Sequence, residues 1–117
     1  MSNVQEYINK LNYNETVEIL DGQSVSTVLN TYGQSVVGLF IKSGFSGASL
    51  TIQTATESGG TFYDVKNIKG TNVSITFSSA GFYQLNATDL SGARFIRFIS
   101  NIAQTGDTTL TFALRAL

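Results

Sequence analysis

The 117-residue sequence contains no cysteine, histidine, proline or tryptophan. Without cysteine there is no disulfide framework. Without histidine or cysteine, Ser-His-Asp and Cys-His catalysis, the usual zinc sites and haem ligation through either residue are excluded. The absence of proline means that edge strands must be protected by twist, charge or a partner strand. We therefore expect a protein that is not an enzyme and that uses no cofactor.

Charged side chains are also scarce. They make up 13% of the chain, and the formal net charge is −1. A nucleic acid backbone is normally met by a basic stripe, and the seven basic residues are scattered, so we expect neither a nucleic acid nor an anionic membrane as partner. No apolar signal core and no stretch long enough to span a membrane is found, so we expect folding in a cytoplasm.

Carboxylates are the remaining route to catalysis or cation binding. Glu57 and Asp64 flank the Gly59-Gly60 turn, and they are the pair that comes nearest to the two carboxylates of a glycosidase. Both are also typical of solvated loops and strand ends, and we favour that interpretation. The eight acidic residues are dispersed and contain no calcium-binding loop pattern, so no metal ligand is predicted.

Alternation of apolar and polar residues with period two is the main positive signal, and it is clearest in the segments that begin at Ala48, Val73 and Leu110. Strands are predicted at residues 16–20, 25–29, 36–42, 48–54, 61–65, 73–77, 82–85, 95–100 and 110–115. Glycine-containing turns separate them. The pattern predicts an all-β protein with a single antiparallel β-sandwich, jelly-roll-like, over residues 15–117.

Residues 1–14 do not follow the strand pattern. Val4, Tyr7, Ile8 and Leu11 recur at helical spacing, which predicts a short amphipathic helix or an N-terminal arm. This segment either packs on its own sandwich or docks on a neighbouring subunit, and the composition is compatible with both.

Two predicted strands, 36–41 and 95–99, are apolar on both faces. In the second, Phe95 and Ile99 share one face with Arg97. Such a strand is either central and covered on both sides, or its second face is buried by another subunit. Two such strands in one small domain favour self-association or docking on a larger protein surface.

The predicted interface combines this strand with the N-terminal segment. Arg94 is expected on the face opposite Arg97, and both arginines suit directed hydrogen bonds to carboxylates or backbone carbonyls of a partner. The residues assigned to the interface are Val4, Tyr7, Ile8, Leu11, Arg94, Phe95, Arg97 and Ile99.

Adjacent aromatic residues leave a second function open. Phe62 precedes Tyr63 and Phe82 precedes Tyr83, and neighbours in a strand point to opposite faces. An outward Tyr63 or Tyr83 suits stacking on a sugar ring. The alternative is therefore a carbohydrate- or receptor-binding β-sandwich module, such as a fibre or adhesin-like domain.

The sequence resembles small structural proteins of tailed bacteriophages in four segments that occur in the same order. They are residues 36–41, 48–55 and 59–65, followed by Leu-Ser-Gly-Ala-Arg-Phe-Ile-Arg at 90–97. The resemblance covers about residues 35–115. It implies a jelly-roll-like virion protein, such as a capsid decoration (cement) protein or another head or tail component. It implies the major capsid protein or another virion protein as partner, a homo-oligomer with a trimer favoured, and location in the virion after synthesis in the host cytoplasm. It carries over no catalytic residues.

Overall fold

Nine β-strands and one 3-10 helix lie within residues 12–116, the part of the chain that the computed structural model describes. The strands are β1 (Asn12–Ile19), β2 (Leu29–Asn30), β3 (Ser35–Ile41), β4 (Ser49–Ala55), β5 (Tyr63–Asp64), β6 (Ser74–Thr76), β7 (Gly81–Gln84), β8 (Phe95–Ser100) and β9 (Thr108–Arg115). The 3-10 helix η1 (Ala87–Asp89) follows β7. No helix in this part of the chain has the length and hydropathy needed to cross a membrane.

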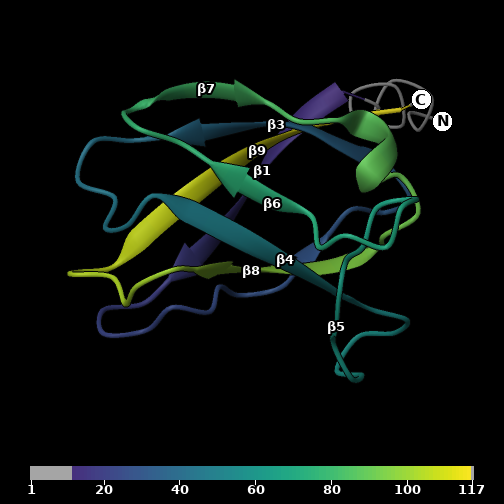
Figure 1. Ribbon diagram of the computed structural model, residues 1–117, viewed down its shortest axis with the longest axis horizontal. Coiled ribbons are helices and arrows are strands. Elements are labelled where there is room, and N and C mark those ends of the chain that lie inside the picture. The colour runs from purple at the N-terminus through teal and green to yellow at the C-terminus, as the bar shows by residue number, and fades with distance from the viewer. Residues whose placement is uncertain (1–11, 117) are drawn as a thin grey trace, which may run out of the picture.

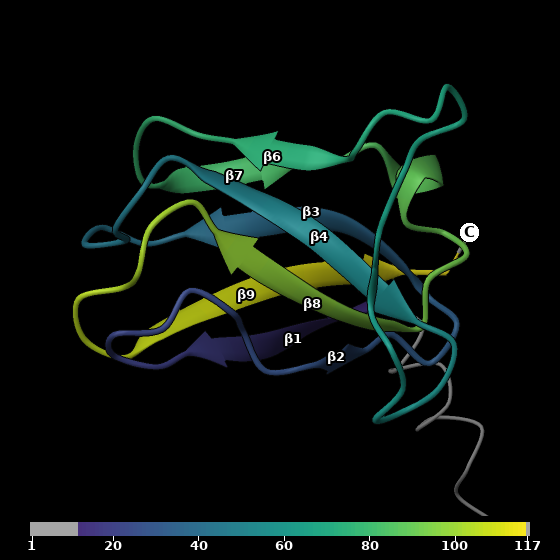
Figure 2. The same ribbon diagram turned by 60° about the horizontal axis from the view of Figure 1, so that its bottom comes forward.

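The strands form two antiparallel sheets that pack face to face (Figure 1). One sheet has the order β1-β9-β3-β7, and the other has the order β2-β8-β4-β5, with β6 also paired to β4. Figure 2 shows the facing pairs from one edge of the sandwich to the other: β6 with β7, β4 with β3, β8 with β9 and β2 with β1. This winding of the chain between two sheets is that of a jelly roll. The predicted all-β, antiparallel, jelly-roll-like sandwich is confirmed.

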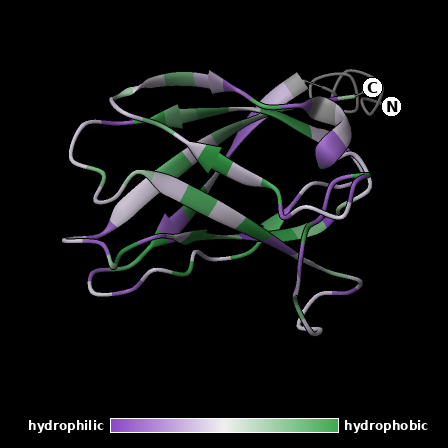
Figure 3. Ribbon diagram, viewed as in Figure 1, coloured by the Kyte–Doolittle hydropathy of each residue, from purple (hydrophilic) through white to green (hydrophobic). Residues whose placement is uncertain are grey.

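The core lies between the two sheets and is built from the inward half of each alternating strand. Figure 3 shows this alternation as successive green and paler bands along β4. In the middle of the core, the rings of Phe98 in β8 and Phe112 in β9 stack with centroids 4.2 Å apart. Burial of such side chains is the main stabilising contribution to a small domain. The largest fully buried side chains are Phe98, Phe112, Ile19, Leu29, Leu39, Leu50, Ile52, Leu90, Ile96, Leu110, Leu114 and Val17.

One predicted strand is much shorter than expected. The sequence predicts a strand at residues 25–29, whereas β2 contains only Leu29 and Asn30. The preceding segment still runs beside β8, because the Ser26 amide donates to the Phe98 carbonyl at 2.8 Å. The Phe98 amide, however, donates to the Ser26 hydroxyl at 2.9 Å. A side-chain oxygen thus replaces a backbone acceptor, and the regular ladder is interrupted there.

The first strand begins earlier than predicted. β1 starts at Asn12, which pairs with Arg115 of β9, so residues 12–14 of the predicted arm belong to the four-stranded sheet. The apolar residues on which the N-terminal helix or arm was predicted lie outside the described residues; they are Val4, Tyr7, Ile8 and Leu11.

Candidate functional site

β8 presents Phe95, Arg97 and Ile99 on the outer face of the five-stranded sheet, where each is half-buried. Ile96 and Phe98 point inward and are fully buried. The alternation between the two faces is the one predicted from the sequence. Within the described part of the chain, β8 is a central strand whose inner face is covered by the sandwich and whose outer face is partly open.

Arg97 is held in place by an aromatic ring and an amide. Its guanidinium carbon lies 4.3 Å from the ring centroid of Phe62, and its Nε donates to Oε1 of Gln53 at 2.8 Å. The Nε2 of Gln53 in turn donates to Oδ1 of Asp64 at 3.0 Å. Gln53 is the cross-strand partner of both Arg97 and Asp64, so the three polar side chains form one row across β8, β4 and β5. These contacts fix the position of the guanidinium before any partner binds.

Arg94 lies on the same outer face, just before β8 begins. Its guanidinium carbon is 5.2 Å from the ring centroid of Phe95 and 5.9 Å from that of Tyr32, and its Nε donates to Oδ1 of Asn30 at 3.4 Å. Alternation along residues 94–99 predicts Arg94 on the face opposite Arg97. That expectation is wrong, because strict alternation applies only within the strand, and the side chain of Arg94 packs over the outward ring of Phe95.

Tyr32 was missing from the predicted interface residues, and a tight turn places it at this face. Tyr32 has a φ of 51° and Gly33 a φ of 82°, and the Gln34 amide donates to the Thr31 carbonyl at 2.9 Å. Positive φ values at both central residues define a type I′ turn, which here lies in the connection from β2 of one sheet to β3 of the other. For a bulky residue this conformation is unfavourable by about 1–2 kcal/mol. The Tyr-Gly pair between two predicted strands is the signal that indicates the turn.

We call the group formed by Tyr32, Phe62, Arg94, Phe95 and Arg97 the arginine face. All three cation–π contacts of residues 12–116 lie within it. Within the same residues, neither arginine forms an ion pair with a carboxylate; each uses its Nε on a side-chain amide oxygen. The terminal guanidinium N–H groups are therefore left to bind carboxylate or carbonyl oxygens of another molecule.

Glu57 and Asp64, the carboxylate pair considered from the sequence, lie in different elements and have different contacts. Asp64 lies in β5 and accepts the hydrogen bond from Gln53. Glu57 is exposed in the preceding turn, where its carbonyl accepts from the Gly60 amide at 3.1 Å. Among residues 12–116, no group of three or more acidic side chains is placed to hold a metal ion.

The outer face of the four-stranded sheet carries a second exposed aromatic group. Thr16, Thr111, Phe40 and Phe82 form one cross-strand row over β1, β9, β3 and β7. The rings of Phe40 and Phe82 are 4.6 Å apart at their centroids and are 39% and 47% exposed. The predicted two-faced strand at 36–41 is thus buried on its inner side and carries this half-open ring on its outer side.

Of the two tyrosines considered for carbohydrate binding, Tyr83 does not point outward. It pairs with the buried Leu39, and its ring packs against Phe77 with centroids 5.9 Å apart. Its hydroxyl donates to the Ser79 carbonyl at 2.6 Å and accepts from the Ser79 amide at 3.2 Å. These bonds with Ser79 lower the pKa of the Tyr83 hydroxyl. Tyr83 therefore stabilises the loop between β6 and β7, and its neighbour Phe82 is the outward residue.

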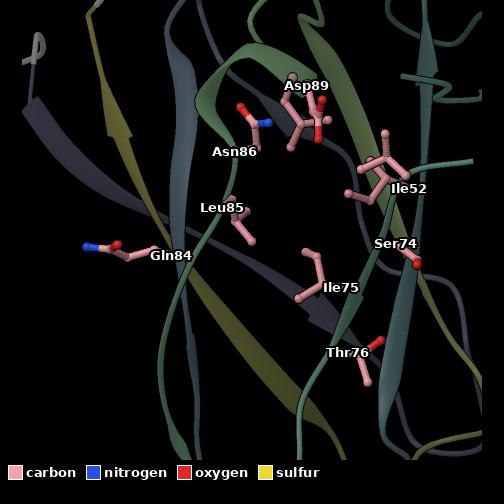
Figure 4. A pocket seen from close by; sticks show the side chains of 10 residues that line it. Ile52, Ser74, Ile75, Thr76, Gln84, Leu85, Asn86 and Asp89 are labelled. Carbon is pink, nitrogen blue, oxygen red and sulfur yellow. The ribbon is translucent and has the colours of Figure 1, made fainter. Parts of the chain in front are cut away.

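A cavity of about 270 Å³ opens between the edge strands β6 and β7, where the two sheets separate. Figure 4 shows Leu85 and Ile75 on either side of it, Asn86 and Asp89 together at one end, and Gln84 pointing away. Its lining combines five apolar side chains with five polar ones: Ile52, Val73, Ile75, Leu85 and Leu90, and Ser74, Thr76, Gln84, Asn86 and Asp89. Binding cavities combine apolar side chains with polar groups that orient the bound molecule.

Comparisons of this chain with models of protein families, with curated proteins and with solved structures give no match. The structure establishes the two-sheet sandwich and the positions of the exposed groups on it.

Proposed function

We propose that the chain is a non-catalytic structural protein of a tailed-bacteriophage virion, most simply a capsid decoration protein that binds the major capsid protein and stabilises the particle. The observation that carries the proposal is the arginine face, where the guanidinium groups of Arg94 and Arg97 lie against aromatic rings without a carboxylate partner among residues 12–116. Its partner is then a protein surface that presents carboxylates or backbone carbonyls.

The energetics of protein interfaces support this assignment. Arginine and tyrosine are enriched among the few residues that contribute most to binding. Side chains that are already held in one position lose less conformational entropy when a partner arrives. Arg97 is held by Phe62 and Gln53, and Arg94 is held by Tyr32 and Phe95, so both are ordered before binding.

Three of the four segments that resemble phage virion proteins meet at the arginine face. Gln53 belongs to the segment at 48–55, Phe62 and Asp64 belong to that at 59–65, and Arg97 closes that at 90–97. The fold brings these three segments together in a single row of contacts. The jelly roll is also a recurrent fold of viral capsid domains, which supports the proposal by analogy only.

The test uses the phage that encodes the chain. Mass spectrometry of purified particles is expected to detect the chain, and purified chain is expected to co-sediment with particles that lack it. The double variant R94A/R97A is expected to bind at least ~10-fold more weakly, because each arginine contributes directed hydrogen bonds at the contact. The matched control is Lys42→Ala, which removes an exposed cation outside the arginine face. Absence of the chain from particles, or equal binding by R94A/R97A, would overturn the proposal.

A second candidate is a carbohydrate- or receptor-binding module. Its supporting observation is Tyr63, which is 65% exposed and lies between Phe62 and the hydrogen-bonded Asp64. An exposed ring beside polar groups suits stacking on a sugar. A glycan array in which the wild type gives signals that Tyr63→Ala loses would favour this candidate, whereas an array without signal removes it.

A further inference from the structure

The hairpin turn between Lys66 and Asn72 carries an apolar side chain at its tip. Ile68 is 101% exposed, which is the highest exposure of any large apolar residue among residues 12–116. It is flanked by the exposed Lys66 and Lys69. A single exposed apolar residue is ordinary on a protein surface. Ile68 differs from such residues because its turn is held in one conformation by hydrogen bonds and because a groove and a cavity lie beside it.

Asn67 organises the turn through its backbone and its side chain. Its Oδ1 accepts from the amides of Lys69 at 2.9 Å and Thr71 at 3.1 Å, and its carbonyl accepts from the Gly70 amide at 2.9 Å. At the base of the hairpin, Nζ of Lys66 donates to Oδ1 of Asn72 at 2.6 Å. Ile68 is thus presented by a turn whose conformation is set before any contact, which lowers the entropy lost on binding.

A groove separates this turn from η1. A hollow of about 460 Å³ is lined on one side by residues 66–69 and on the other by Asn86, Thr88 and Asp89. Asn86 and Asp89 also line the cavity of about 270 Å³ between β6 and β7. An apolar projection with two cations therefore lies beside a cavity whose lining includes the apolar Ile75 and Leu85 and the Asp89 carboxylate.

We propose that two copies of this chain associate through this end of the sandwich, with Ile68 of each copy inserted into the cavity between β6 and β7 of the other. In a twofold pair, each residue that contacts a second residue is contacted by it in return. Because projection and cavity lie side by side, one twofold rotation satisfies both contacts at once. Lys69 of each copy then lies near Asp89 of the other, so the charges are complementary.

The twofold contact is separate from the arginine face, so a dimer through Ile68 and docking through Arg94 and Arg97 can succeed or fail independently. It differs from the trimer favoured by the sequence. Burying one isoleucine from each copy corresponds to at least a ~100-fold change in the dissociation constant of the dimer.

Sedimentation velocity and light scattering of the whole chain over a range of concentrations test the proposal. The wild type is expected to form dimers, and Ile68→Ser is expected to raise the dissociation constant at least ~100-fold. Ile68 is fully exposed, so this variant is expected to fold normally. The matched control is Ile102→Ser, at an isoleucine that is 51% exposed and outside both the turn and the cavity lining. A wild type that stays monomeric at millimolar concentration, a trimer, or equal association by Ile68→Ser would overturn the proposal.

Exchanging the charges at positions 69 and 89 tests whether the two copies contact each other through the same pair of residues in both directions. In a dimer of Lys69→Glu chains, the new carboxylate of each copy faces the Asp89 carboxylate of the other. In a dimer of Asp89→Lys chains, the new ammonium group of each copy faces the Lys69 ammonium group of the other. Each variant is therefore expected to dimerise more weakly than the wild type. When the two variants are mixed in equal amounts, a dimer of one copy of each places opposite charges at positions 69 and 89 in both contacts. Such mixed dimers are therefore expected to form. Failure of the mixture to associate better than either variant alone would contradict the twofold arrangement. Ile68-dependent binding to phosphatidylserine vesicles by a monomeric wild type would overturn the proposal in favour of a lipid surface.

Discussion

The ring of Phe82 occupies the space that a side chain at Gly38 would need. A Cβ built on Gly38 would overlap Cζ and Cε1 of Phe82. Gly38 lies in β3 and pairs with Gln84, and Phe82 lies on the neighbouring edge strand β7, where it also contacts Phe40. An aromatic ring that covers a strand glycine replaces the packing that the glycine lacks. The exposed aromatic pair of the four-stranded sheet therefore depends on this glycine.

Gly38→Ala is expected to lower the free energy of unfolding by about 1–3 kcal/mol, because the added methyl group forces the Phe82 ring or the backbone to move. In the background of Phe82→Ala the same substitution is expected to have a much smaller effect, since the space is then free. Urea denaturation of the four proteins of this double-mutant cycle measures the coupling. Equal effects of Gly38→Ala in the two backgrounds would show that the ring does not cause the loss.

Gln104→Ala is expected to destabilise the chain by about 2–4 kcal/mol. Gln104 is 2% exposed, its Oε1 accepts from the Ser46 amide at 3.0 Å, and its Nε2 donates to the Ser46 carbonyl at 2.7 Å. Truncation removes both bonds and leaves the backbone groups of the half-buried Ser46 without their partner. Thermal and urea denaturation measure the loss. The control is Gln84→Ala, at an exposed glutamine, for which a change within about 0.5 kcal/mol is expected; a similarly small change for Gln104→Ala would contradict the prediction.

The strands were predictable because their residues alternate, and alternation is a local property. The segment 95–100 coincides with β8, and the faces of Phe95, Arg97 and Ile99 follow from period two. The rule fails where a side chain competes with the ladder, as Ser26 does beside β8, and where the register shifts inside a strand, as between Val36 and Gly38 of β3. Which of Phe82 and Tyr83 points outward could not be predicted, because period two gives the alternation but not which face is inward.

The arginine face was predictable only in part. Arg94 and Arg97 were assigned to an interface from their strand. Their aromatic partners come from distant loops: Phe62 precedes β5, and Tyr32 lies in the turn before β3. Contacts between segments far apart in the chain depend on the strand order, which period two does not determine. The same holds for the pairing of Gln104 with Ser46, residues separated by 58 positions.

The contribution of Tyr13 to the stability of the chain is expected to fall as the pH rises above about 10. Burial raises the pKa of the Tyr13 hydroxyl, and Glu15 and Tyr32 raise it further. Above the ordinary tyrosine pKa, the unfolded chain has released this proton while the folded chain still holds it. The folded state then binds more protons, so the free energy of unfolding decreases with pH.

Tyr13→Phe is expected to make this decrease less steep, and urea denaturation between about pH 9 and 11 measures it. Glu15→Gln is expected to produce a smaller change in the same direction, because burial is the larger cause of the raised pKa. An unchanged slope in Tyr13→Phe would show that another group is responsible.

Asn67→Ala is expected to loosen the turn that presents Ile68 without unfolding the sandwich. The substitution removes the Oδ1 acceptor for the amides of Lys69 and Thr71, and both amides lie in an exposed hairpin outside the core. Their hydrogen exchange is expected to become about 10-fold faster, since losing a hydrogen bond of about 1.4 kcal/mol in a locally opening segment changes its opening equilibrium by that factor. Core amides such as those of Ile96 and Phe98 are expected to exchange at the wild-type rate. Asn67→Asp keeps an oxygen acceptor and is expected to retain most of the protection, so that equal exchange in the alanine and aspartate variants would show that the Asn67 side chain does not order the turn.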